Sequence, residues 1–67
     1  MDYSKLRGAI REKFHTEKAF AEAFGCSAGA MSMKLNNKTN WTQDEIFRAC
    51  QLLDIPDNQV NEYFFTL

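Results

Sequence analysis

Residues 16–38, TEKAFAEAFGCSAGAMSMKLNNK, contain two short helix-forming segments separated by a tight turn. In the first segment Phe20 and Phe24 lie one helical turn apart, and the alanines around them permit the close approach of another helix. Gly25 follows as a stop, because glycine readily takes the positive φ found at helix C-termini. The spacing therefore predicts a helix over residues 17–24 that ends at the turn.

A second helix is predicted to begin almost directly after this turn. Ser27 is a favourable N-cap, since its hydroxyl can accept a hydrogen bond from a free amide of the first turn. Met31 and Leu35 are again one turn apart and give residues 28–35 one buried face. The polar run over residues 36–40 predicts where this helix ends.

Three further helices are predicted on either side of this pair. Before it, apolar residues recur at three- and four-residue intervals, which predicts a first helix that ends near Phe14. After it, Thr42 and Glu45 have the spacing of a capping box at the start of a fourth helix. A short fifth helix is expected over residues 57–64. No segment alternates with period two for long enough to predict a strand, so we expect an all-α fold. It should be a compact four- to five-helix bundle in a single domain, residues 1–67.

Composition and cysteine usage limit the classes of function. The chain is 45% hydrophobic and 25% charged, a balance typical of a folded domain. Cys26 and Cys50 have no metal-binding spacing and there is one histidine, so we expect no metal site. Because the sequence has no phosphate loop or nucleophile motif, we expect no enzyme activity, cofactor or small-molecule substrate. With neither a secretory nor a membrane-spanning segment, we expect the chain in the cytoplasm.

Charge is unevenly distributed along the chain. The net charge is −1, but residues 4–41 contain seven basic and three acidic side chains, whereas residues 42–67 contain one basic and five acidic. The basic half includes the two central helices and could face phosphate while the acidic half stays in solvent. Ordinary solvated helix faces explain the same distribution equally well.

The central stretch resembles the helix-turn-helix of phage repressors and Cro-like proteins. Phe20-Ala21 matches the family's apolar residue followed by a small one, Gly25 occupies the turn, and Ser27 caps the recognition helix. WTQDEIFRACQLLDIP, residues 41–56, resembles the family's next helix, and the whole chain is similar to small helix-turn-helix proteins from prophages of Gram-positive bacteria. The resemblance implies a lambda-repressor/Cro-like fold. It also implies a transcriptional repressor of a lysis–lysogeny switch, a homodimer that binds double-stranded operator DNA.

The resemblance also indicates which residues would touch the partner. Phosphate contacts are expected from Thr16, Lys18, Ser27, Asn36, Lys38 and Asn40. The residues expected to face the DNA major groove are Ala28, Gly29, Ser32 and Met33. Family members usually place Gln, Asn, Arg or Lys at several such positions, because those side chains bond to purine edges, but here none comes before Asn36. The alternative is therefore an anti-repressor or modulator that binds the cognate phage repressor protein through the same surface.

The last five residues, YFFTL, are apolar, although chain ends are more often polar. One or two of the rings can complete the core of so small a domain. We expect the remainder to form an exposed patch, which favours self-association. Completion of the core alone is the alternative.

Overall fold

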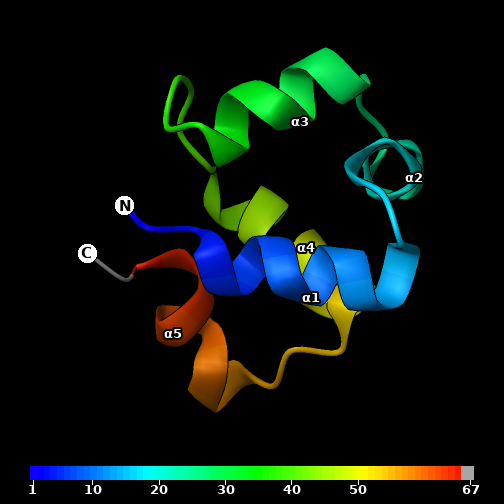
Figure 1. The fold of residues 1–67 in the computed structure, drawn as a ribbon. Coiled ribbons are helices and arrows are strands. Elements are labelled where there is room, and N and C mark those ends of the chain that lie inside the picture. The colour runs from blue at the N-terminus through cyan, green and yellow to red at the C-terminus, as the bar shows by residue number, and fades with distance from the viewer. Residues whose placement is uncertain (66–67) are drawn as a thin grey trace.

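The computed structural model describes residues 1–65, and within this range it consists of helices joined by short connections (Figure 1). The elements are α1 (Ser4–Phe14), α2 (Glu17–Phe24), α3 (Ala28–Leu35), α4 (Gln43–Leu53), the 3₁₀ turn η1 (Asp57–Gln59) and α5 (Val60–Phe64). The all-α prediction is confirmed, and the two central helices have the predicted bounds. The predicted fifth helix begins instead as a 3₁₀ turn, and only its last five residues are α-helical.

Side-chain caps begin three of the helices. The Thr16 hydroxyl oxygen accepts a hydrogen bond of 3.0 Å from an amide of the first turn of α2, and Ser27 does the same for α3 at 3.0 Å. At α4 the amide of Glu45 donates to Thr42 Oγ1 at 3.2 Å, while the amide of Thr42 donates to the Glu45 carboxylate at 2.9 Å. This is a complete capping box, as the spacing of these two residues predicts.

The turn between α2 and α3 is fixed from two directions. Gly25 has φ 100°, in the left-handed region, and its amide donates to the carbonyl of Ala21 at 2.9 Å. From α4, Arg48 Nη1 donates to the carbonyl of Phe24 at 2.9 Å, and the guanidinium lies 4.4 Å from the centroid of the Phe24 ring. The end of α2 is therefore fastened to α4 as well as being closed by glycine.

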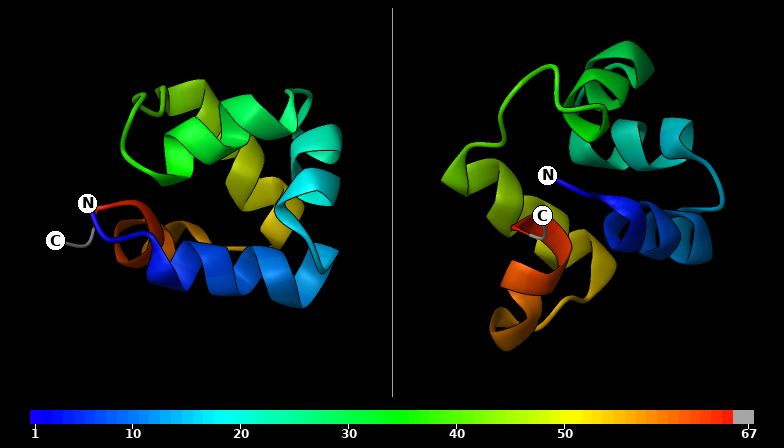
Figure 2. Two further views of the ribbon diagram at one scale, coloured as in Figure 1. Left: turned by 45° about the horizontal axis from the view of Figure 1, so that its top comes forward. Right: turned by 60° about the vertical axis from the view of Figure 1, so that its left-hand side comes forward.

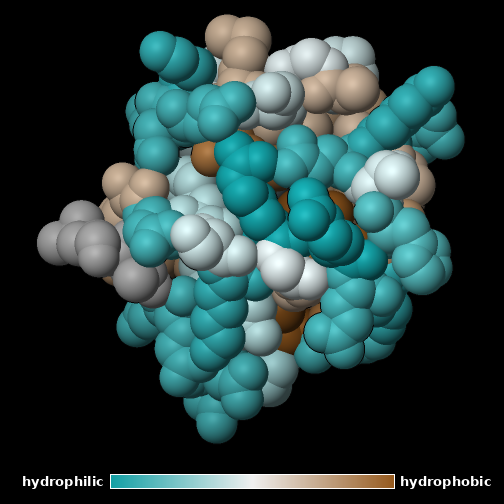
Figure 3. Space-filling model, in the orientation of Figure 1, coloured by the Kyte–Doolittle hydropathy of each residue, from teal (hydrophilic) through white to brown (hydrophobic). Residues whose placement is uncertain are grey.

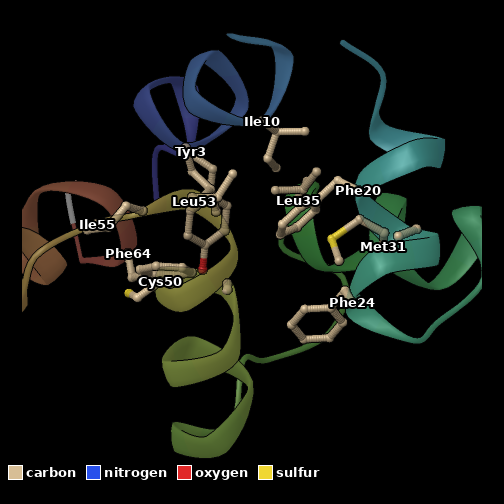
Figure 4. Close-up of a cluster of buried hydrophobic side chains, with 13 residues drawn as sticks. Tyr3, Ile10, Phe20, Phe24, Met31, Leu35, Cys50, Leu53, Ile55 and Phe64 are labelled. Carbon is tan, nitrogen blue, oxygen red and sulfur yellow. The ribbon is translucent and has the colours of Figure 1, made fainter. Parts of the chain in front are cut away.

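The hydrophobic core lies where the helices meet, and every α-helix contributes to it (Figure 4). The largest fully buried side chains are Leu6 and Ile10 of α1, Phe20 of α2, Met31 of α3 and Phe64 of α5. Figure 2 shows the start of α1 beside the end of α5, and these two helices are in contact. The first and last helices thus close the bundle together.

The C-terminal aromatic residues divide between core and surface. Phe64 is 2% exposed and completes the core, Tyr63 is partly buried, and Phe65 is 50% exposed. Thr66 and Leu67 belong to the same predicted patch but lie outside the described residues. The prediction that one or two rings are buried and another is left exposed is confirmed for the three aromatics. Within residues 1–65 no helix is long and apolar enough to span a membrane.

Candidate functional site

The residues predicted to touch a partner lie on α3 and on the segments at its two ends. Met31 and Leu35 point into the core, and this leaves Ala28, Gly29 and Met33 exposed, with Met33 48% exposed. In Figure 3 the edge of the molecule occupied by α3 shows neutral and apolar atoms between hydrophilic ones. The exposed face of α3 is therefore small, uncharged and partly apolar.

Two of the predicted phosphate contacts are helix caps in the structure. The hydroxyl oxygens of Thr16 and Ser27 each accept a hydrogen bond from their own helix. Both residues are exposed, and a hydroxyl that accepts one bond retains its own proton for another. Capping alone nevertheless accounts for both side chains.

The polar side chains at the end of α3 bond to each other and to α1. Asn36 Nδ2 donates to Ser32 Oγ at 3.2 Å, and Asn36 Oδ1 accepts from Arg7 Nη2 at 2.8 Å. The same Arg7 nitrogen donates to the carbonyl of Leu35 at 3.0 Å. DNA bases facing this surface would have to compete with these contacts.

The remaining predicted contacts are in the flanking segments. Lys18 and Lys38 are exposed, and neither forms an ion pair within the described part of the chain. The carbonyl of Asn40 accepts from Lys34 Nζ at 3.2 Å, while the Lys34 ammonium also lies 5.5 Å from the centroid of the Trp41 ring. Lys18, on α2, and Lys38, in the segment after α3, therefore keep an exposed positive charge.

Most of the basic residues in the first half of the chain are neutralised internally. The ion pairs are Lys5–Glu62 at 2.6 Å, Arg7–Glu17 at 2.5 Å, Lys34–Glu45 at 2.8 Å and Lys13–Asp54. The Glu62 carboxylate raises the pKa of Lys5, and the Lys34 ammonium, with the Thr42 amide, lowers the pKa of Glu45. Four of the seven basic side chains in residues 4–41 thus face a carboxylate, so the positive potential is weaker than the sequence count suggests.

A hollow that the sequence analysis missed lies between α4 and the η1–α5 segment. Its volume is about 480 Å³, and its apolar lining residues are Trp41, Ile46, Phe47, Cys50, Val60 and Phe65. Burial raises the pKa of the Cys50 thiol, with a smaller contribution from the charge of Asp57, so the thiol stays neutral at pH 7. The one sequence signal for this hollow is Phe47, a large apolar residue outside the buried stripe of α4.

No group of three or more His, Cys, Asp or Glu side chains is placed to hold a metal ion among residues 1–65. The features of the described surface that bear on a site are the uncharged α3 face, the exposed Lys18 and Lys38, and the apolar hollow beside α4.

Comparison with known proteins places the chain among phage proteins. The solution structure of the modulator of repression of the temperate bacteriophage TP901-1 from Lactococcus lactis is similar, with a TM-score of 0.87 and 43% sequence identity over 97% of this chain and 88% of that chain. No curated protein sequence gives a significant match. The similarity supports the expected relationship to small phage proteins, but it is to a modulator of repression and does not single out a Cro-like regulator. A family model described as "Protein of unknown function (DUF739)" matches residues 1–67, and the chain therefore belongs to the DUF739 family.

Proposed function

We propose that this chain is a phage modulator of repression, which binds the repressor protein of its own phage or prophage and weakens the binding of that repressor to operator DNA. The observation that carries the proposal is the similarity to the modulator of phage TP901-1, which extends over 97% of the chain at 43% identity. A repressor-binding modulator is also the alternative function in the sequence analysis, where the predicted recognition helix lacks side chains that bond to purine edges.

The exposed face of α3 has the chemistry of a protein contact. Methionine side chains adapt to varied partner surfaces, and Met33 on this face is half exposed. At Gly29 the backbone itself is exposed, and a Cβ built there would meet nothing closer than Ser27 Oγ at 4.0 Å. A partner can therefore approach the α3 backbone closely at Gly29.

The operator-binding alternative has weaker support. Binding to DNA rests on neutralising phosphates, and specificity rests on side chains that bond to base edges. Here the basic half is largely paired internally, and Ser32 and Asn36 bond to each other. The charged groups of the predicted site are therefore only Lys18 and Lys38. Two lysines offer few contacts to DNA phosphates, and this favours a protein partner over duplex DNA.

Calorimetric titration of the repressor with the purified chain tests the proposal. We expect a complex with the wild-type chain and at least tenfold weaker binding for Gly29→Glu, because a carboxylate buried without a partner in an interface is strongly unfavourable. Gly8→Glu is the matched control, since Gly8 is exposed on α1 and a Cβ there meets nothing within 4 Å. The absence of any complex with the wild-type chain would refute the proposal. Equal binding by both glutamate variants and the wild type would place the contact elsewhere than α3.

A further inference from the structure

The hollow between α4 and α5 is bordered by two of the most exposed apolar side chains of the molecule. Phe47 is 58% exposed on α4 and Phe65 is 50% exposed after α5, while Cys50 forms a buried part of the wall. Large aromatic side chains beside an apolar hollow are typical of a contact site. In the fold these rings stabilise little, since more than half of the Phe47 side chain faces solvent.

This hollow is continuous with the segment that follows α3. A second hollow, of about 380 Å³, includes Asn37 and Asn40 in its lining and shares Trp41, Ile46 and Phe65 with the first. Figure 1 shows the segment after α3 running back to the start of α4, beside the N-terminus and the end of α5. We call the two hollows together the α4–α5 groove. It runs from the segment that follows α3 to the space between α4 and α5.

The charge at the Asp57 end of the groove is acidic. Asp57 lies in its lining, and Asp44 is one helical turn before Phe47 on α4; neither carboxylate has an ion-pair partner among residues 1–65. No lysine or arginine lines either hollow, and the amino-terminal residue Met1 lies in the second hollow, away from Asp57. Lys38, between the lining residues Asn37 and Thr39, and Lys34, whose Nζ lies 5.5 Å from the Trp41 ring, place positive charge beside the second hollow. Arg48, next to Phe47 in sequence, is bound to the Phe24 carbonyl. The carboxylates at the Asp57 end therefore favour the binding of a positively charged group.

The α3 face alone is too small for a stable protein complex. A stable interface covers about 800 Å² on each partner, and the whole described molecule exposes 4375 Å², so about a fifth of its surface must be covered. α3 has eight residues, and two of them are core residues. A repressor bound to α3 must therefore also cover neighbouring surface, and the groove is an apolar surface that begins in the segment directly after α3.

We propose that the repressor extends from α3 into the α4–α5 groove, an inference that rests on the proposed function. In the groove the repressor inserts an apolar side chain that is flanked by lysine or arginine. A second copy of this chain fits less well. In a two-fold symmetric contact the same patch meets itself, so one interface would contain two copies of the acidic Asp57–Asp44 border. The acidic border thus selects a basic segment of the repressor.

Trp41 provides a direct report of what occupies the groove. It is the single tryptophan of the chain and lines both hollows, and its indole N–H has no hydrogen-bond acceptor within the described range. In a ¹⁵N-labelled sample it gives one indole cross-peak, which an unlabelled repressor cannot obscure. We expect this peak to shift when the repressor binds, together with the amide peaks of α3.

Two variants test the groove by affinity. Phe47→Ser should weaken repressor binding at least tenfold, as expected for loss of a central aromatic contact, with Gln51→Ser one turn further along α4 as control. Asp44→Asn combined with Asp57→Asn should weaken binding about three- to tenfold and reduce its dependence on salt. Glu12→Gln, an exposed carboxylate on α1, is the control for loss of charge. Because all these side chains are exposed, each variant should retain the wild-type circular dichroism spectrum.

The outcomes separate this proposal from the proposed function. If Gly29→Glu abolishes binding while the groove variants bind normally and the Trp41 peak is unmoved, the groove proposal is overturned and the modulator function stands. If the wild-type chain forms no complex, both fall together. A concentration-dependent dimer of the chain that Phe47→Ser dissociates would show that a second copy occupies the groove, and this too would overturn the proposal.

Discussion

Phe64 and Phe65 are neighbours in sequence that should differ sharply in their contribution to stability. Phe64 is 2% exposed, and its ring meets the Trp41 ring edge-on with the centroids 5.1 Å apart. Truncation of a buried phenylalanine to alanine usually costs about 3–5 kcal/mol through lost burial and the cavity left behind. Phe65 is 50% exposed, so the same truncation there should cost less than about 1 kcal/mol.

This difference is large for a chain of 67 residues, because the free energy of unfolding of such a domain is about 3–10 kcal/mol. We therefore expect Phe65→Ala to remain folded and Phe64→Ala to lose most of its stability, with a fall in Tm of about 12–40 °C. Urea denaturation followed by circular dichroism measures both. If Phe64→Ala does not fold, Phe64→Leu should still fold with a loss of about 1–2 kcal/mol. Equal losses for the two alanine variants would refute the assignment of Phe64 to the core.

Two further predictions concern the start of α4. Thr42→Ala removes the hydroxyl that accepts a hydrogen bond from the Glu45 amide and should lower the free energy of unfolding by about 1 kcal/mol. An unchanged denaturation midpoint would show that this cap contributes nothing to stability. The pKa of Glu45 is lowered in the folded state, so its contribution should be fully present above the ordinary carboxyl pKa and disappear as pH falls through the lower folded value. The stability difference between the wild type and Glu45→Gln should therefore shrink on acidification from pH 6 to pH 2. A constant difference would contradict the assignment.

The helices could be predicted because their signals are local. The Thr42–Glu45 capping box and the Gly25 stop involve residues within a few positions of each other, and each appears in the structure with the expected partner. The buried sides of α2 and α3 follow from one-turn spacing of large apolar residues. The 3₁₀ turn at Asp57 was not predicted, because the sequence pattern does not distinguish i→i+3 from i→i+4 hydrogen bonding.

Much of the candidate site could not be predicted, because it depends on contacts between distant residues. Lys5 pairs with Glu62 across 57 positions, and Arg7 reaches Asn36 across 29. A count of charges along the sequence cannot show that such pairs neutralise the basic half. The α4–α5 groove was missed for the same reason, since its two walls meet only after the chain has folded.

The central claim is that this chain acts on a repressor protein and not directly on the operator. A mobility-shift experiment with operator DNA, the repressor and the purified chain tests it most directly. We predict that the chain alone does not shift the operator, that it removes the shift produced by the repressor, and that Gly29→Glu fails to remove it while Gly8→Glu succeeds. A salt-sensitive shift of the operator by the chain alone, with the repressor's own shift unaffected, would contradict the account.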